Sequence, residues 1–265
     1  EQANVWLSGS KGLPKAMLQL LERQPVAELT GLNEAICAEP DSVIGRLSAF
    51  LAGCGAAALA LQGPPGTGKS TVTAGVIAQL VATGKRVAIS SNSHAAINNL
   101  LRKAKTTCEQ QGLPGVVVKC SNSKSEEQLA GSGIPLVPAH ALTDEMAVVG
   151  GTTWMFCRDE LSEQFDLLVI EEAGQMSLAN LLVMARCAKT ILLVGDQQQL
   201  AQPTQADHPG DSGLSCLEYL MQGAHVVPAD LGVFLATSWR MEPSLTAMVS
   251  QLFYDGRLNA NPANA

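Results

Sequence analysis

Short apolar runs alternate with longer segments of helical periodicity along most of the chain. This alternation predicts an α/β protein with a mostly parallel, doubly wound sheet. Gly84 is expected to end the first long helix. The expected strands are 57–61, 86–90, 116–119, 146–150, 167–170, 191–194 and 233–236, and the expected helices are 69–82, 94–104, 178–188 and 213–221.

Three stretches lack this regular pattern. Residues 1–45 carry weak helical patterns and no recognisable chemistry. Residues 120–140 are rich in Ser, Gly, Pro and Lys, which predicts a surface insertion. Residues 201–212 follow an expected strand and are predicted to form a long loop.

The composition limits the classes of function. Hydrophobic residues make up 46% of the 265 positions and aromatic residues only 4%, so an aliphatic core suited to buried parallel strands is expected. A net charge of −7 excludes a wholly basic surface and disfavours indiscriminate binding of nucleic acid. Specific contact through a local groove stays open.

The cysteines and the apolar segments indicate a cytoplasmic protein without a membrane partner. The longest apolar stretch, 49–61, is too short to cross a bilayer, and no secretion signal is visible at the first residues. The cysteines show no CxxC pair, so we expect reduced and mostly buried thiols rather than disulfides or a zinc ribbon. They are Cys37, Cys54, Cys108, Cys120, Cys157, Cys187 and Cys216.

The strongest chemical signal is a GxxxxGK[ST] motif between an expected strand and an expected helix. Backbone N–H groups of such a loop close around phosphates, and the helix N-terminus adds positive potential. Lys69 is expected to reach the β- and γ-phosphates of ATP, and the Ser70 hydroxyl to bind Mg²⁺. The predicted nucleotide-binding residues are Gly63, Pro64, Pro65, Gly66, Thr67, Gly68, Lys69, Ser70 and Thr71.

Two further strands are expected to bring polar groups to the same edge of the sheet. The run 165–170 ends in Glu171 and Glu172, which are placed to act near the metal and on the attacking water. The run 191–194 is followed by Asp196 and Gln199, polar groups suited to sensing the γ-phosphate. If either pattern stood alone, it could be explained by polar residues that only cap a strand and have no functional role.

The order of these blocks resembles superfamily 1 helicases. GPPGTGKS, SSNSHAAINNLL, VIEEAGQ and LVGDQQQL are similar to motifs I, Ia, II and III, and 234–243 with 252–258 resembles the YRMHP…FYxGxL motif. That last pattern is typical of superfamily 1B, the up-frameshift/senataxin-like group. The residues within these blocks are most similar to those of bacterial helicases fused to a RecB-like nuclease domain.

The resemblance implies a role for each matching residue. Lys69, Glu172, Gln199 and Arg240 would be catalytic, Gln175 would join the nucleotide site, and Ser70 with Glu171 would hold the metal. Single-stranded DNA or RNA would contact Ser91, Asn92, His94, Thr152 and Thr153. A helix N-cap is the alternative role of Ser91, Asn92 and His94. Trp154 is expected in the core rather than stacked on a base.

The resemblance also implies a domain organisation. Residues 46–232 would form the first RecA-like lobe with a small insertion at 105–145, residues 1–45 an extension, and 233–265 the start of a second lobe. The remainder of that lobe, with another arginine finger, is expected elsewhere in a parent chain. The chain departs from the family at Glu171 and Glu242, which stand where Asp and His are usual.

Three classes of function remain open on the sequence. The first is an ATP-dependent helicase or translocase. The second is another P-loop enzyme, such as a GTPase or a small-molecule kinase. A GTPase should carry an Asn-Lys-x-Asp motif, which the sequence lacks, and a kinase should carry a basic lid, whereas 201–212 has no Lys or Arg. The last is a non-motor nucleotide-binding module or an ATPase independent of nucleic acid.

Overall fold

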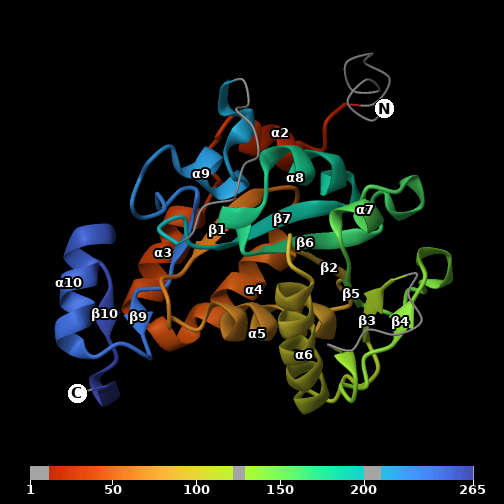
Figure 1. Ribbon diagram of the computed structural model, residues 1–265, viewed down its shortest axis with the longest axis horizontal. Helices are drawn as coiled ribbons and strands as arrows, with labels where there is room; N and C mark the ends of the chain where they lie inside the picture. Colours follow the sequence, from red (N-terminus) through yellow and green to blue (C-terminus); the bar gives the residue numbers. More distant parts are fainter. Residues whose placement is uncertain (1–11, 122–128, 200–209, 265) are drawn as a thin grey trace.

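Eight parallel strands form one continuous sheet, in the order β4-β3-β5-β2-β6-β7-β1-β8 (Figure 1). The computed structural model describes residues 12–121, 129–199 and 210–264. The parallel sheet confirms the predicted α/β class. Its strands are β1 Ala58–Gln62, β2 Val87–Ser90, β3 Val117–Cys120, β4 Leu136–Val137, β5 Val148–Gly150, β6 Phe165–Glu171, β7 Ala188–Gly195 and β8 Gly232–Phe234.

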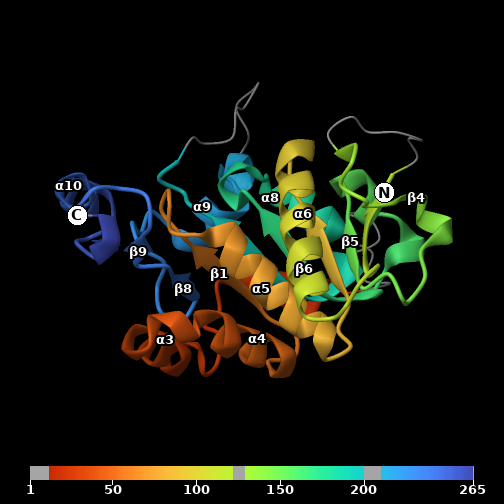
Figure 2. The same cartoon turned by 90° about the horizontal axis from the view of Figure 1, so that it is seen from below.

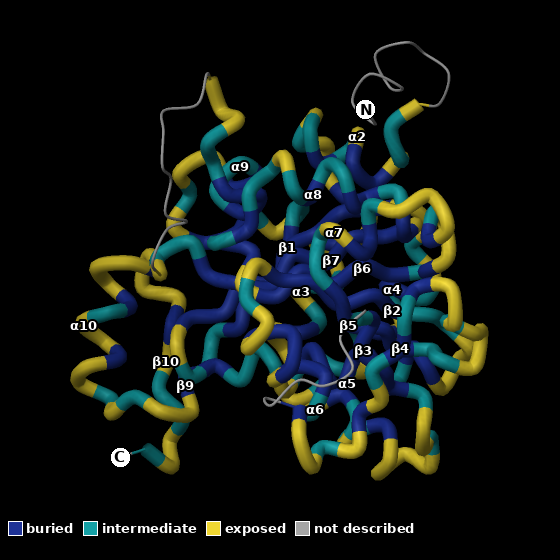
Figure 3. The backbone as a smooth tube through the Cα atoms, turned by 45° about the vertical axis from the view of Figure 1, so that its right-hand side comes forward, coloured by how far each residue is buried: buried dark blue, intermediate teal, exposed yellow. Residues whose placement is uncertain are grey.

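Helices cover both faces of the sheet, so its central strands are buried on both sides. One face packs on α3 (Leu29–Ala38), α4 (Val43–Gly53), α5 (Lys69–Ala82) and α6 (His94–Gln110). The other packs on α2 (Lys15–Leu21), α7 (Thr153–Phe156), α8 (Leu178–Met184) and α9 (Cys216–Met221). Figure 1 shows the two helical layers on either side of the strands, Figure 2 looks onto the layer of α3 to α6, and Figure 3 shows that the strands between the layers are buried.

The strands are apolar because alternate side chains enter the two opposite cores. In β6, Leu168 and Ile170 pack on the α2 side, and Leu167 and Val169 pack on the α5 side. The central strands β6, β7 and β1 are parallel neighbours in matching register, so they end together at one edge of the sheet. That edge receives the loops after each strand.

The observed elements differ from the expected ones at several positions. Helix α5 has the predicted bounds, but α6 continues to Gln110, and the segment expected to be helical to residue 188 ends as α8 at Met184. The chain continues as a single 3₁₀ turn over Ala185–Cys187, and β7 begins at Ala188. Strand β4 falls in the stretch predicted as a surface insertion, of which 122–128 lies outside the described residues.

The regions outside the expected first lobe also contact the sheet. Met17 and Leu20 of α2, within the predicted N-terminal extension, are fully buried against one face, and Leu29 of α3 against the other. Strand β8 pairs with β1, so the predicted boundary at residue 233 falls inside a strand of the eight-stranded sheet. Of the predicted 201–212 loop, residues 201–209 lie outside the described ones.

A small unit follows β8. It consists of β9 (Thr237–Ser238), α10 (Pro243–Phe253) and β10 (Asn259–Ala260), and its two strands pair in parallel. In Figure 2 this unit lies beyond β8, at one end of the molecule. Helix α10 buries only Thr246 and Ser250. Glu242, where the family has His, caps this helix by accepting from the N–H groups of Ser244 at 3.1 Å and Leu245 at 3.4 Å.

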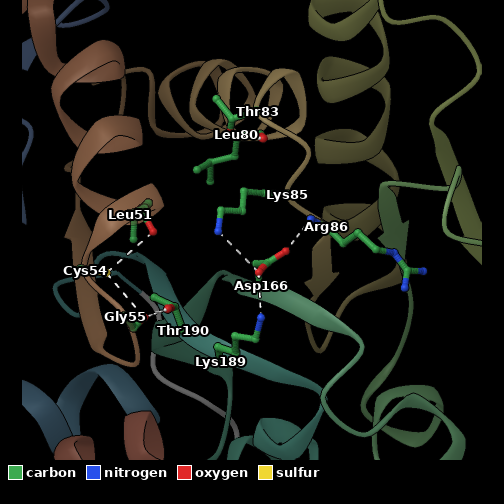
Figure 4. A network of polar contacts seen from close by, with 10 residues as sticks. All are labelled: Leu51, Cys54, Gly55, Leu80, Thr83, Lys85, Arg86, Asp166, Lys189 and Thr190. Carbon is green, nitrogen blue, oxygen red and sulfur yellow. Dashed lines mark hydrogen bonds and ion pairs between the residues drawn. The ribbon is translucent and has the colours of Figure 1, made fainter.

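At the opposite edge from the polar strand ends, Asp166 joins three segments (Figure 4). Its carboxylate accepts from the Arg86 N–H at 3.0 Å and from the Lys189 ammonium at 3.2 Å, and it lies 3.7 Å from Lys85 Nζ. Partial burial alone would raise the pKa of Asp166, but these hydrogen bonds and charges hold that pKa below its ordinary value. Asp166 therefore ties the start of β6 to its two neighbouring strands.

All seven cysteines are free thiols, and four of them are buried. Burial raises the pKa of Cys108 and Cys120 to about 11, so these thiols stay protonated near neutral pH. Within the described residues, each helix is too short or too polar to cross a lipid bilayer.

Candidate functional site

The loop between β1 and α5 folds back on itself over residues 63–68. Gly66 and Gly68 have φ values of 82° and 80°, in the left-handed region that other residues rarely adopt. A Cβ at Gly63 would come within 2.5 Å of the Lys69 side chain. The Thr67 hydroxyl is buried and donates to the Pro64 carbonyl at 2.8 Å. Gly63, Pro64 and Thr67 therefore shape the loop, and exposed Thr71 lies in the first turn of α5.

Lys69 is the first residue of α5, and its side chain turns back into the loop. Its ammonium donates to the carbonyl of Gly63 and, at 3.4 Å, to that of Pro64. Burial lowers the pKa of Lys69, while the carboxylates of Asp196 and Glu171 act in the opposite direction. The loop thus presents a partly desolvated cation beside the N-terminus of α5, an arrangement suited to binding phosphate.

Ser70 and Glu171 meet between α5 and the end of β6. The Ser70 hydroxyl donates to Glu171 Oε1 at 3.0 Å. Glu171 is only 7% exposed, and its buried Oε2 has no hydrogen-bond partner among the described residues. Burial raises the pKa of Glu171 despite the Ser70 hydroxyl and the Lys69 ammonium. An unsatisfied carboxylate oxygen beside a hydroxyl is a donor set that fits Mg²⁺, a hard cation that binds oxygen.

Glu172 lies where the chain leaves β6, with φ 57° and ψ 46°. A left-handed conformation at a residue other than glycine stores backbone strain, which is common at functional sites. The turn is closed by the Gln175 N–H, which donates to the Glu172 carbonyl at 2.8 Å. This turn directs Glu171 into the protein and leaves Glu172 exposed at the cavity.

These groups line one cavity of about 320 Å³ at the polar edge of the sheet. The segment after β7 contributes Asp196 and Gln199, and the unit after β8 contributes Arg240. The fold therefore brings together most of the predicted phosphate, metal and catalytic residues. The residues that line the cavity are Pro65, Gly66, Gly68, Lys69, Ser70, Lys103, Glu171, Glu172, Gly174, Gln175, Gly195, Asp196, Gln199 and Arg240.

Four lining residues were not among the predicted site residues: Lys103, Gly174, Gly195 and Asp196. Asp196, which the sequence indicated only as a polar group after a strand, is 5% exposed and accepts from Gln199 Nε2 at 3.2 Å. Lys103 is an exposed residue on α6, a helix that packs beside α5. No pattern in the sequence distinguishes Lys103 from the other cations of α6.

The predicted nucleic-acid residues lie at the ends of two neighbouring strands, β2 and β5. Ser91 is buried, whereas Asn92 and His94 are exposed, and the Asn92 amide donates to the Gln175 carbonyl at the nucleotide cavity. Thr152 and Thr153 are half-buried at the start of α7. The interpretation of Ser91, Asn92 and His94 as a helix N-cap was wrong.

The residue that caps α6 is Ser93. Its hydroxyl accepts from the Ala96 N–H at 3.3 Å, and His94 is already the first helical residue. The His94 ring lies 3.1 Å from the ammonium of buried Lys119. The cap is local, so it leaves the exposed Asn92 and His94 side chains on the surface beside it.

The expectation that Trp154 is part of the core was also wrong. Its side chain is 81% exposed. Helix α7 is a single turn on the surface, and its Met155 and Phe156 fill the core instead. A large exposed indole therefore lies next to Thr152 and Thr153.

The parallel sheet and the phosphate loop define a RecA-like P-loop NTPase fold. A family model described as "AAA domain" matches residues 47–208, more than half of the chain, and the chain belongs to this family.

Relatives with helicase names extend this assignment. The chain is 29% identical over 207 residues to the DNA replication ATP-dependent helicase/nuclease DNA2 of Gallus gallus, covering 75% of this chain and 20% of that protein. It is 28% identical to the DNA2 protein of Schizosaccharomyces pombe, covering 75% and 14%. It is 25% identical to the ATP-dependent helicase NAM7 of Saccharomyces cerevisiae, covering 75% and 24%.

The chain thus spans less than a quarter of the length of these relatives. Their names confirm the predicted resemblance to superfamily 1 helicases. The finer resemblance, to helicases fused to a RecB-like nuclease, stays a prediction.

Proposed function

We propose that this chain is the ATP-binding lobe of a helicase or translocase that couples ATP hydrolysis to movement on single-stranded DNA or RNA. One observation carries the proposal: Arg240, from the unit after β8, enters the same cavity as Lys69, Ser70 and the Glu171–Glu172 pair. A cation delivered by a separate unit is what an NTPase needs if turnover is to depend on how two units close.

Each group in the cavity has a role in the proposed reaction. Lys69 and the loop N–H groups bind the β- and γ-phosphates, and Ser70 with Glu171 holds Mg²⁺, which would neutralise charge on the phosphate oxygens. Glu172 accepts the proton of the attacking water, because it is exposed to the cavity and free of a cationic partner in the described residues. Gln175, Gln199 and Arg240 contact the γ-phosphate.

The proposed path of the single strand crosses the ends of β2 and β5. Asn92, His94, Thr152 and Thr153 offer amide, imidazole and hydroxyl groups for phosphates, contacts that carry no sequence information. The exposed Trp154 offers a face on which a base can stack. Asn92 also contacts the Gln175 carbonyl, so one hydrogen bond links the proposed path of the nucleic acid to the nucleotide cavity. Ser91 is buried, and its hydroxyl accepts from the Ser93 N–H at 3.3 Å.

The domain organisation belongs to the same proposal. We extend the predicted first lobe, 46–232, to the end of β8 at Phe234 and place the start of a second lobe after it, with the remainder of that lobe in a longer parent protein of the cytoplasm. The relatives' greater length supports this arrangement. The 265-residue chain should therefore bind ATP with Mg²⁺ but turn it over slowly, because opposing arginines contribute about 10³-fold or more to such reactions.

The proposal is tested by ATP turnover of the two-lobed protein with and without single-stranded DNA or RNA. Turnover should rise on adding the strand, and Lys69→Ala or Glu172→Gln should abolish the increase. Glu160→Gln is the matched control, because Glu160 is an exposed carboxylate in a surface ion pair with Arg158. Turnover that saturating single strands leave unchanged would favour an ATPase independent of nucleic acid and exclude the motor.

A further inference from the structure

The segment 252–258 resembles a helicase motif, yet it does not line the nucleotide cavity. Its third residue, Tyr254, is the C-cap of α10 and is 3% exposed. The ring packs beside Phe234 of β8, with centroids 6.0 Å apart. The hydroxyl donates to Asp196 Oδ2 at 2.7 Å. A buried hydrogen bond thus joins the unit after β8 to the turn after β7.

Asp196 is the acceptor at the centre of that turn. Besides the Tyr254 hydroxyl, its carboxylate accepts from Gln199 Nε2 at 3.2 Å and from the Gln198 N–H at 3.3 Å. An amide nitrogen has two hydrogens, so Gln199 retains one donor for the cavity that it lines. The orientation of Gln199 is therefore set by a carboxylate that Tyr254 holds.

The same unit reaches the phosphate loop at a second point. The Trp239 N–H donates to the Gly66 carbonyl at 2.9 Å, and Arg240 follows directly into the cavity. Two contacts fix the unit against the site, one beside the loop at Gly66 and one behind the turn at Asp196. Only the second ends on a buried charge.

We propose that Tyr254 is a positioning residue for recognition of the γ-phosphate: its hydroxyl holds Asp196, and Asp196 holds Gln199 toward the triphosphate. The inference rests on the proposed function, and it assigns to segment 252–258 a link between the second unit and the nucleotide. A nucleotide that lacks the γ-phosphate does not engage this link.

Removing the hydroxyl should redirect Asp196. A buried carboxylate that loses a donor is costly, so it turns to the donors and cations around it. The candidate that already donates to this carboxylate is Gln199. Gln199 would be drawn away from the γ-phosphate, a group that ADP lacks. The loop contacts to the other phosphates, made by backbone N–H groups, would persist.

The test is the ratio of affinities for two fluorescent nucleotides, a non-hydrolysable ATP analogue and ADP, each with Mg²⁺, measured on the 265-residue chain. Tyr254→Phe keeps the ring and should lower the preference for the triphosphate about five- to tenfold, with ADP affinity within twofold. The matched control is Tyr219→Phe, because Tyr219 is the other tyrosine and its hydroxyl donates to the Leu21 carbonyl at 2.8 Å, outside the cavity.

Asp196→Asn reports on the same link from its other partner. It should lower the triphosphate preference as well, and the double variant with Tyr254→Phe should add little to either single change. If Tyr254 only fastened α10 to the sheet, Tyr254→Phe would lower the melting temperature and weaken both nucleotides equally. That result, or a ratio equal to that of the unmodified chain, overturns the inference.

The outcome also separates this inference from the proposed function. If the unmodified chain binds neither nucleotide, or if Lys69→Ala leaves binding intact, the nucleotide site itself is wrong and the inference falls with it. If the unmodified chain prefers the triphosphate, Lys69→Ala abolishes binding, and Tyr254→Phe keeps the preference, only the role of Tyr254 is wrong.

Discussion

Asp166 and Glu171 lie near the two ends of the same strand, β6, and the fold surrounds them in opposite ways. Asp166 accepts from a backbone N–H and an ammonium group, with a second ammonium nearby (Figure 4). Glu171 is buried, accepts from one hydroxyl, and keeps one oxygen without a partner in the described part of the chain. The pKa of Asp166 is lowered, and that of Glu171 is raised.

The difference separates a carboxylate that stabilises the fold from one that is held ready for a ligand. Around Asp166, the positive partners come from the protein itself, so its charge is compensated in the folded state. Around Glu171, compensation is incomplete, and burying such a charge costs free energy unless a cation arrives. The charge of Asp166, at the amino edge of the sheet, is therefore compensated by the protein, whereas compensation of the charge of Glu171, at the carboxyl edge, depends on a bound cation.

The largest effect that tests this contrast is expected from Glu171→Gln. Loss of the metal-binding carboxylate should lower the Mg²⁺-dependent ATP turnover of the two-lobed protein by at least about 100-fold. The free energy of unfolding of the nucleotide-free chain should rise, by up to about 1 kcal/mol, because the uncompensated charge is gone. Turnover across a Mg²⁺ titration and urea unfolding provide the two measurements. A marked loss of stability would contradict the assignment.

Asp166→Asn should show the reverse pattern, with a smaller effect. The amide loses charge pairing with Lys85 and Lys189, so the free energy of unfolding should fall by about 1 kcal/mol. Nucleotide affinity should stay within twofold, since the residue lies at the opposite edge from the cavity. Urea unfolding and fluorescent-nucleotide titration on the same samples check both parts. Weakened nucleotide binding would mean that the two edges are coupled.

The smallest effect is the pH dependence of these stability differences, which should run in opposite directions. Because the folded-state pKa of Asp166 is lowered, its contribution is present above the unfolded pKa of about 3.9 and is lost as the pH falls through the folded value. The deficit of Asp166→Asn should therefore shrink in acid. Parallel deficits from neutral pH to the acid range would argue against this role of Asp166.

For Glu171 the sign is reversed. Its folded-state pKa is raised, so its contribution is fully present below the unfolded pKa of about 4.3 and is lost as the pH rises through the folded value. The advantage of Glu171→Gln should therefore grow from acid to neutral pH. Urea unfolding of the three proteins at several pH values measures both trends, and an advantage that shrinks toward neutral pH would refute this one.

Much of the carboxyl edge of the sheet, where the cavity lies, could be predicted because the residues that form it are set by local sequence patterns. The motif at 63–70 sets the loop and the start of α5, and Gly84 follows its end, so the bounds of that helix match. The apolar runs placed β6 and β7 with their acids at the correct edge. Local patterns of this kind need no knowledge of the partners across the sheet.

The features that escaped prediction depend on contacts between distant segments. Trp154 is exposed because α7 lies on the surface, whereas the apolar residues next to it in the sequence, Met155 and Phe156, favour a core position. The pairing of β8 with β1 and the Tyr254–Asp196 hydrogen bond join segments far apart in the chain. No periodicity encodes them. Lys103 reaches the cavity only because α6 packs against α5.

Gly66 has a consequence for how such proteins can be recombined. A Cβ at this position would lie 2.6 Å from Arg240 Cβ, and the backbone there is left-handed. A side chain at residue 66 would displace the arginine even if the loop tolerated it. A chimera that takes the eight-stranded sheet from one homologue and the unit after β8 from another must therefore keep this glycine and the close approach of the arginine together. In protein engineering, the two segments form one exchangeable cassette.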